Sequence, residues 1–208
     1  MPFRIITVVE GHGETEAVPI LIRRFATEQR DPVVPVVAPR SIRISRTKIV
    51  KAGELERAVR LAALQLQGNG AVFVVLDADD DCPAQLGPAL LARSEAVAHA
   101  HGDFPVSVVI AQAEFEAWFL AAALSLRNRR GLTNDLMPPV DPEALRDAKG
   151  WLTHNMHGRR RYSEVLDQPA LAACMDLAAA RASQSFEKFR RDVMLIFDGL
   201  LGISGHSE

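Results

Sequence analysis

The feature that most constrains this fold is an alternation of short apolar runs and helical patterns along the first half of the chain. Four apolar runs, most of them rich in β-branched residues, cover residues 3–9, 33–37, 71–77 and 105–111. Such runs are typical of strands buried on both faces. Between them, apolar residues recur at helical spacing, which predicts helices around residues 18–25, 55–66 and 84–101. The alternation predicts an α/β fold in which helices cover a parallel sheet.

Proline and glycine residues indicate where two of these predicted helices begin and end. Pro19 is expected in or near the first turn of the first helix, where its missing N–H costs least. The breaker Gly68-Asn69-Gly70 is expected to close the second helix. These residues limit where the first helix can begin and where the second must end.

After residue 111 the strand signals fade and helical patterns take over. Phe115, Trp118 and Phe119 mark the apolar face of a fourth helix, and a loop rich in charge, Pro and Gly follows. Ser185 is interpreted as the N-cap of the last helix. Further helices are expected over residues 141–148, 167–181 and 184–201.

Chain length limits the number of domains, and the positions of the two cysteines limit the kinds of site that can be predicted. With 208 residues the chain fits one domain of ordinary size, or one domain with an appendage. We expect an α/β core over residues 1–112 and a helical extension over residues 113–208, packed on that core as one structural unit. Cys82 and Cys174 lie far apart without metal-ligand spacing, so neither a zinc site nor a disulfide framework is predicted.

Charge and hydropathy patterns favour some classes of protein over others. The 24 basic and 26 acidic residues nearly balance, so any binding of nucleic acid must depend on local basic patches. The apolar run at the N-terminus is too short for a signal peptide, and no run approaches the roughly 18 to 20 apolar residues of a membrane span. We therefore expect a cytoplasmic protein without a membrane segment.

Two acidic loops follow expected strands at their carboxyl ends. They are Glu10-Gly11-His12-Gly13-Glu14 after the first strand and Asp77-Ala78-Asp79-Asp80-Asp81 at the end of the third. In an open parallel sheet, ligand sites form outside the carboxyl ends of the strands. If these strands are neighbours, Glu10, Asp77 and Asp79 converge, which is costly unless a cation or a shared proton neutralises them. Ligand sets made only of oxygen atoms suit Mg²⁺ or Mn²⁺.

Other interpretations of the same loops compete with a metal site. A Walker loop is excluded because its Lys and following hydroxyl are missing, and a phosphatase would carry an aspartate after the first strand, where this chain has Glu10. Asp and Gly are also ordinary turn formers, so solvated turns remain an alternative. Glu14 and Glu16 are assigned to favourable charge at a helix N-terminus, and Asp80 to solvent.

The same residues carry a family resemblance. VVEGHGETE followed by VVLDADDD resembles the TOPRIM domain, the topoisomerase–primase fold also used by OLD-type nucleases, in which a Glu-Gly follows the first strand and a DxD the third. Glu10-Gly11 and Asp77-Ala78-Asp79 match that order, and Asp81 extends it to DxDxD. AEFEAWFLAAAL (113–124) and SFEKFRRD (185–192) are similar to a bacterial TOPRIM-like family of unknown function that is often found beside ATPases.

The resemblance implies metal-dependent phosphoryl transfer on nucleic acid. Asp77 and Asp79 would hold a Mg²⁺ or Mn²⁺ ion, and Glu10 would act as general acid/base or as a ligand of a second ion. A metal pair stabilises both the attacking and the leaving oxygen of an in-line displacement. Asp81 is a candidate further ligand, as are Glu114 and Glu116 after the fourth strand, although carboxylates there could simply favour a helix N-terminus.

Basic and glycine residues are the candidates for contact with phosphate. Gly11 and Gly13 are expected to let the loop turn closely around the ion. Basic runs usually form solvated faces, but they can also bind backbone phosphates, and such runs occupy residues 41–51, 127–130 and 157–162. The predicted phosphate contacts are Gly11, His12, Gly13, Lys149, Arg159, Arg160 and Arg161.

Two functions of different class follow from these patterns. The first is a Mg²⁺-dependent nuclease acting on nucleic acid, DNA rather than RNA, together with a partner ATPase. The second is a non-catalytic, metal-binding TOPRIM module that serves as a regulatory or adaptor subunit. A basic face beside the acidic cleft would favour the nuclease, and an exposed apolar patch near the last helices would favour the adaptor. The sequence leaves the oligomeric state open, a homo-oligomer included.

Overall fold

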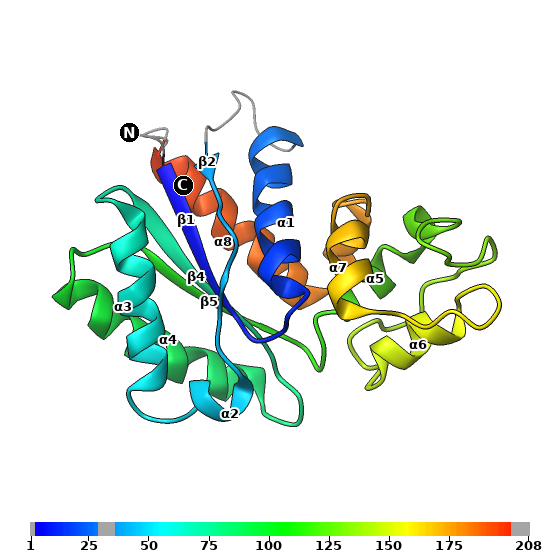
Figure 1. Cartoon of the computed structure of the whole chain (residues 1–208), viewed down its shortest axis with the longest axis horizontal. Coiled ribbons are helices and arrows are strands. Elements are labelled where there is room, and N and C mark those ends of the chain that lie inside the picture. Colours follow the sequence, from blue (N-terminus) through cyan, green and yellow to red (C-terminus); the bar gives the residue numbers. More distant parts are fainter. Residues whose placement is uncertain (1–2, 29–35, 201–208) are drawn as a thin grey trace, which may run out of the picture.

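A parallel sheet forms the centre of the computed structural model, which describes residues 3–28 and 36–200 (Figure 1). Within these residues the sheet has five strands in the order β2-β1-β4-β5, and β3 pairs with β1 on the same edge as β2. All pairs are parallel, as the sequence predicted. The strands are β1 (Phe3–Val9), β2 (Val36–Val37), β3 (Ile42–Arg43), β4 (Gly70–Asp77) and β5 (Val106–Ala111).

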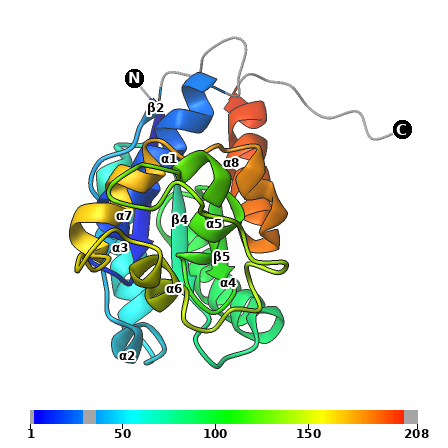
Figure 2. The same cartoon turned by 90° about the vertical axis from the view of Figure 1, so that its right-hand side faces the viewer.

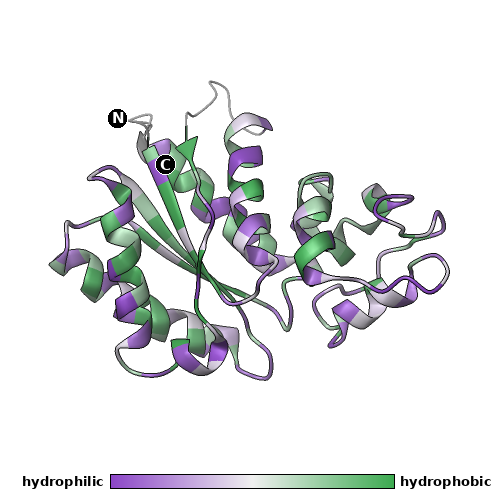
Figure 3. Ribbon diagram, viewed as in Figure 1, coloured by the Kyte–Doolittle hydropathy of each residue, from purple (hydrophilic) through white to green (hydrophobic). Residues whose placement is uncertain are grey.

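Helices cover both faces of this sheet, which explains why its strands have apolar residues at successive positions. One face of β1, β4 and β5 packs under α3 (Glu54–Leu66) and α4 (Pro83–Ala100). The opposite face packs against α1 (Glu14–Glu28) and α8 (Gln184–Leu200). Figure 3 shows strands that are hydrophobic along most of their length, whereas the helices alternate between polar and apolar faces.

The C-terminal part of the chain continues the apolar cluster on the α1 and α8 side of the sheet. Trp118 is fully buried and stacks on Phe189 of α8, with ring centroids 5.3 Å apart. Phe189 also contacts Phe25 of α1 and Phe73 of β4. α5, α6 and α7 gather beside the sheet (Figures 1 and 2). The remaining helical elements are α2 (Arg46–Ile49), α5 (Ala117–Ala121), η1 (Ala123–Leu126), α6 (Ala148–His154), α7 (Glu164–Ala172) and η2 (Ala179–Ala182).

Strand and helix boundaries agree with the sequence prediction where the apolar pattern is long. The run over residues 33–37 is a strand at Val36–Val37, and its other residues lie outside the described part of the chain. α3 ends at Leu66 because Gln67 and Gly68 take positive φ angles of 56° and 86°. No helix within the described ranges is long and apolar enough to cross a membrane.

Pro19 lies further inside its helix than the sequence predicted. Because α1 begins at Glu14, Pro19 falls in the second helical turn. A proline cannot donate a hydrogen bond to the carbonyl four residues earlier. That carbonyl belongs to Thr15, and it accepts a hydrogen bond of 3.0 Å from the backbone N–H of Ser41 instead. The segment before β3 therefore satisfies the acceptor that the proline leaves free.

Two helices predicted for the C-terminal part are wrong in extent. The helix expected over 141–148 is a turn, in which the Asp141 carboxylate accepts hydrogen bonds from the backbone N–H groups of Glu143 and Ala144, and α6 starts only at Ala148. The helix expected over 167–181 is divided into α7 and η2, and the Asp176 carboxylate accepts from two N–H groups at the break. Aspartates that bind nearby N–H groups favour turns over a continuing helix.

Candidate functional site

The acidic loops lie together at the carboxyl edge of the sheet because β1 and β4 are neighbours. Val9 pairs with Val75, and Asp77 pairs with Ala111 of β5, so the residues that follow β1, β4 and β5 emerge at one end of the sheet. Glu10 follows β1, Asp77 ends β4, and Glu114 and Glu116 come shortly after β5. The structure therefore brings acids from three strand ends to one edge.

The inner acid group consists of Asp77, Glu114, Glu116 and Glu164, and it surrounds the side-chain ammonium of Lys149 on α6. The Lys149 Nζ atom lies 3.0 Å from an oxygen of Glu116, 3.6 Å from one of Glu114 and 3.8 Å from oxygens of both Asp77 and Glu164. The backbone N–H of Lys149 also donates to Glu114 at 3.1 Å. One cation thus serves four carboxylates, which hold it in place.

Glu116 is the most enclosed acid of the inner group, with no exposed surface. One of its oxygens accepts hydrogen bonds from the Tyr162 hydroxyl at 3.0 Å and from the Gln168 amide at 3.2 Å. Asp77 is fixed by the backbone N–H of Phe115, which donates to it at 2.7 Å. The inner carboxylates are therefore held by hydrogen bonds as well as by the ammonium.

Burial and mutual repulsion shift the ionisation of this group. Burial, with the charge of Glu116, raises the pKa of Glu14 to about 8, although the backbone N–H of Gly11 opposes the shift. Burial and the charges of Glu14 and Glu116 raise the pKa of Asp77 well above its ordinary range. Burial lowers the pKa of Lys149, but Glu116 and Asp77 outweigh it and raise that pKa above its ordinary value. These shifts favour the charged form of Lys149 and the protonated forms of Glu14 and Asp77.

The outer acid group consists of Glu10, Asp79 and Asp81, and it contacts Arg46 of α2. The Arg46 guanidinium forms an ion pair with Asp81 and lies 3.9 Å from an oxygen of Asp79. Burial and the charge of Asp79 raise the pKa of Glu10, while Arg46 lowers it. The Glu10 Oε2 atom is shielded from solvent and has no hydrogen-bond partner among the described residues.

Glu14 joins the two groups, and the sequence had assigned it only to helix-start electrostatics. Its carboxylate accepts a 3.2 Å hydrogen bond from the backbone N–H of Glu10, and its side chain is buried. The Glu-Gly-x-x-Glu spacing is the signal that could have found it, because it places the second glutamate of the motif at the start of α1, where its carboxylate accepts from the backbone N–H of Glu10. Glu164 and Gln168 were also missed as site residues, and Arg46 and Tyr162 were included only as members of the basic runs 41–51 and 157–162. Only the tertiary fold brings these four residues to the acids.

The two glycines of the first loop have different roles. A side chain at Gly11 would collide with the Glu14 carboxylate, whose Oε1 lies 2.6 Å from the place of a Cβ atom. A Cβ at Gly13 would come within 2.2 Å of the Glu164 carbonyl oxygen and 2.1 Å of the Gln168 side chain. Gly11 thus makes room for a site carboxylate, and Gly13 allows the start of α1 to lie against α7.

The other predicted phosphate contacts lie in different environments. His12 is exposed, as are Arg159 and Arg161. Arg160 instead forms an ion pair with the carboxylate of Asp167, which also contacts Arg130 and is fully buried. All three arginines of this run are thus exposed, but Arg160 is also held by the buried carboxylate of Asp167.

The acids of the second loop that follow Asp77 are largely exposed to solvent. Asp80 pairs with Arg146 at 2.8 Å, and both side chains are more than four-fifths exposed. Asp79 has a positive φ angle of 51°, a conformation that Asp tolerates better than most residues. Its backbone N–H donates to the Ala113 carbonyl at 3.1 Å, so the loop is anchored next to β5.

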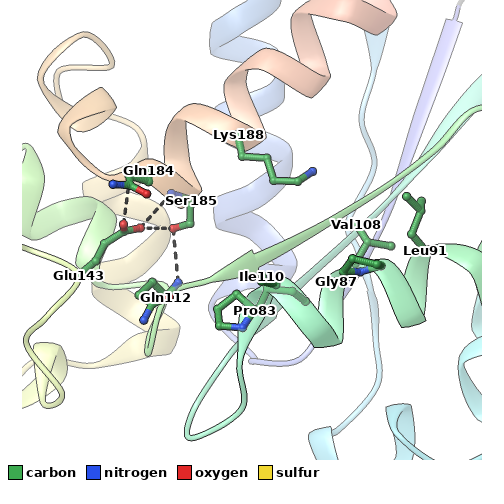
Figure 4. A pocket seen from close by; sticks show the side chains of 12 residues that line it. Pro83, Gly87, Leu91, Val108, Ile110, Gln112, Glu143, Gln184, Ser185 and Lys188 are labelled. Carbon is green, nitrogen blue, oxygen red and sulfur yellow. Dashed lines mark hydrogen bonds between the residues drawn. The ribbon is translucent and has the colours of Figure 1, made fainter.

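A separate cavity lies along the edge strand β5, between α4 and the start of α8 (Figure 4). Its volume is about 420 Å³. Glu143 accepts hydrogen bonds there from the backbone N–H and the hydroxyl of Ser185, which in turn accepts from the Trp118 indole at 2.8 Å. Ser183, not Ser185, caps α8 by accepting the N–H of Phe186 at 3.1 Å. The predicted N-cap at Ser185 is therefore wrong, because Glu143 binds that hydroxyl.

The acidic edge fits a divalent cation in its chemistry but not in its present spacing. The donors are oxygens alone, as Mg²⁺ prefers, and Glu10 has an oxygen without a partner among the described residues. Within residues 3–28 and 36–200, however, no three Asp, Glu, His or Cys side chains are placed so that they could hold a metal ion. Arg46 and Lys149 already neutralise these carboxylates.

Fold and site together define an α/β protein with a carboxylate-rich site at the carboxyl edge of a parallel sheet. The chain belongs to the family described as "Domain of unknown function (DUF4276)", whose model matches residues 9–193. Among solved structures, the C-terminal region of the Burkholderia pseudomallei OLD protein is similar to this chain at 18% identity and a TM-score of 0.43. That match covers 93% of this chain and 100% of the other. No curated protein matches the sequence.

Proposed function

We propose that this protein is a Mg²⁺-dependent nuclease of the TOPRIM type, which hydrolyses phosphodiester bonds of DNA rather than RNA and works with a partner ATPase. The observation that carries the proposal is the convergence of acids from the ends of β1, β4 and β5 at one sheet edge. The Glu-Gly and DxDxD motifs stand at these strand ends, as the TOPRIM resemblance requires. Raised pKa values in such a cluster are typical of functional sites.

The proposed ligands of Mg²⁺ or Mn²⁺ come from both acid groups. Once bound, such an ion supplies charge stabilisation at the phosphoryl group and lowers the pKa of a coordinated water. The residues that would hold it are Glu10, Asp77 and Asp79, with Asp81, Glu114 and Glu116 as further oxygen donors and Glu14 added from the geometry.

The protein's own side chains have separate roles in the proposed hydrolysis. A water oxygen attacks phosphorus, its proton passes to a carboxylate, and the sugar oxygen leaves. Glu10 suits the proton transfer because burial raises its pKa and its Oε2 atom is unpartnered among the described residues. Lys149 keeps Asp77 and Glu116 in place and neutralises part of their charge.

Exposed basic residues flank the acidic edge on two sides and suit a nucleic-acid backbone. Arg43 and Lys48 lie on the segment of β3 and α2, and Arg159 and Arg161 lie between α6 and α7. Figure 1 shows α2 and α6 at the same end of the sheet, on either side of the loop that follows β4. Contacts of this kind predict binding that weakens as salt rises.

A second candidate function is a non-catalytic, metal-binding subunit of a partner. Val165 and Leu166 on α7 expose 59% and 65% of their surface, next to the acidic edge through Glu164. Exposed apolar neighbours of this kind favour a protein contact. This candidate binds Mg²⁺ but does not cleave.

A cleavage assay with matched acid variants tests the proposal. The protein is incubated with supercoiled plasmid, single-stranded DNA or RNA, in Mg²⁺, Mn²⁺ or a chelator. Glu10→Gln and Asp77→Asn should each lower the cleavage rate by at least about 100-fold, as expected when a group essential to the reaction is removed. The control is Asp80→Asn, which removes an exposed acid from the same loop and should cleave as the wild type does. Metal binding without cleavage of any substrate would instead establish the second candidate.

A further inference from the structure

Arg46 lies against the acid loop although 35 residues separate it from Asp81 in the sequence. Its side chain is only 15% exposed. The guanidinium pairs with Asp81 through Nη2 and approaches Asp79 through Nε. Arg46 also lowers the pKa of Glu10, through its charge and its backbone N–H. The outer acid group is thus assembled around a positive side chain.

Arg46 pairs with acids that are more accessible than those around Lys149, although the Arg46 side chain is itself less exposed, at 15% against 33%. Lys149 has four carboxylate partners within 3.8 Å, one of them fully buried. The Arg46 partners Asp79 and Asp81 have side chains that are 58% and 60% exposed. Its Nη1 atom is shielded from solvent and has no hydrogen-bond partner in the described part of the chain. Because Asp79 and Asp81 remain accessible to solvent, a divalent cation can reach these carboxylates and compete with the guanidinium.

We propose that Arg46 is a positioning residue that takes the place of the divalent cation at Glu10, Asp79 and Asp81 and leaves that place when the cation binds. The inference rests on the proposed function, because it assigns the metal to the same acids. It also explains why the carboxylates are not spaced for a metal in this structure, since the guanidinium holds two of them. Once released, a guanidinium is suited to bidentate contact with a substrate phosphate.

Mn²⁺ binding, followed by the electron paramagnetic resonance signal of the free ion, tests the competition. Arg46→Met removes the competing guanidinium, and we expect Mn²⁺ to bind about 3- to 10-fold more tightly, as the loss of two exposed ion pairs implies. The matched control is Arg146→Met, which removes an ion pair of the same charge type from the same loop, but one formed with Asp80, an acid outside the proposed site. Its Mn²⁺ affinity should stay within about twofold of the wild type.

Binding of a fluorescent single-stranded oligonucleotide gives a readout of opposite sign. With Mn²⁺ saturating and a non-cleavable phosphorothioate backbone, Arg46→Met should bind the oligonucleotide several-fold more weakly, because the released guanidinium is missing. A variant that merely distorted the site would weaken both ligands. In the wild type, the Arg46 Nε–Hε resonance, assigned by its loss in Arg46→Lys, should shift in proportion to Mg²⁺ bound, which needs no destabilised variant.

The outcomes separate this inference from the proposed function. Mn²⁺ binding of equal or lower affinity in Arg46→Met, or a stationary Arg46 resonance on Mg²⁺ binding, would overturn the role of Arg46 and leave the nuclease proposal intact. Absence of Mn²⁺ binding in the wild type and in Arg46→Met would overturn the role of Arg46 and the proposed metal-dependent function together. Tighter Mn²⁺ binding together with weaker oligonucleotide binding in Arg46→Met supports the exchange.

Discussion

Replacing Glu14 with glutamine should flatten the dependence of folding stability on pH. Glu14 is buried at the start of α1, and burial, together with the charge of Glu116, raises its pKa from an ordinary 4.5 to about 8. The unfolded chain exposes the same carboxyl to water and restores its ordinary pKa. Between these two pKa values Glu14 therefore holds a proton in the folded protein that it loses in the unfolded chain.

The sign and the size of the effect follow from proton linkage. A group whose pKa is raised on folding favours the folded state at low pH, and this contribution is lost as the pH rises through the folded-state pKa. One extra proton in the folded state lowers the free energy of unfolding by about 1.4 kcal/mol per pH unit, or about 4 kcal/mol between about pH 5 and pH 8. Asp77 and Glu116 steepen the same slope, because burial raises their pKa values as well.

Urea unfolding at several pH values in the presence of a chelator measures this slope. The wild-type free energy of unfolding should fall as the pH rises from about 5 to 8, and Glu14→Gln should remove about 1.4 kcal/mol per pH unit from that slope. The control is Glu16→Gln in the same helical turn, where the side chain is exposed, and its slope should equal that of the wild type. A wild-type slope in Glu14→Gln would refute the buried, proton-holding role of this carboxyl.

Two further substitutions, one of them with a matched control, test the packing and the buried charge around the site. Gly13→Ala should lower the free energy of unfolding by about 1–3 kcal/mol, because its methyl group would lie within 2.2 Å of a backbone carbonyl of α7. Gly87→Ala on α4 meets only an ordinary 3.7 Å contact, so thermal melts should show an equal or higher melting temperature there and a lower one for Gly13→Ala. Asp167→Asn should cost about 1–3 kcal/mol in urea unfolding, since it weakens the hydrogen bonds of a buried side chain to two partly exposed arginines. Unchanged stability of Asp167→Asn would show that neither arginine depends on this charge.

The core of the fold could be predicted because its signals are local and long. β1, β4 and β5 each have at least six residues, nearly all buried, so their apolar runs are continuous in the sequence. β2 and β3 have two residues each, too few for a periodic pattern, and β3 was missed. α6 begins where the Asp147 side chain caps it, at 2.8 Å from the Gly150 N–H, whereas an Asx turn occupies the stretch where a helix was expected.

The site was predictable only in part, for a different reason. Glu10, Asp77 and Asp79 could be named because each stands at a strand end, and parallel strands bring such ends to one edge. Their neighbours Lys149 and Tyr162 come from the helical extension, where no pattern relates them to the sheet. Their positions depend on how α6 and α7 pack against the strand ends.

The sequence by itself determined a parallel α/β sheet and the position of its acids at the ends of the strands. It could do so because hydrophobic periodicity and loop position act over a few residues. Only the tertiary structure decided that Glu14 is buried between the two acid groups and that Lys149 and Arg46 neutralise them. Such contacts join residues far apart in the chain, and they form only where the packing of separate helices and loops brings opposite charges together.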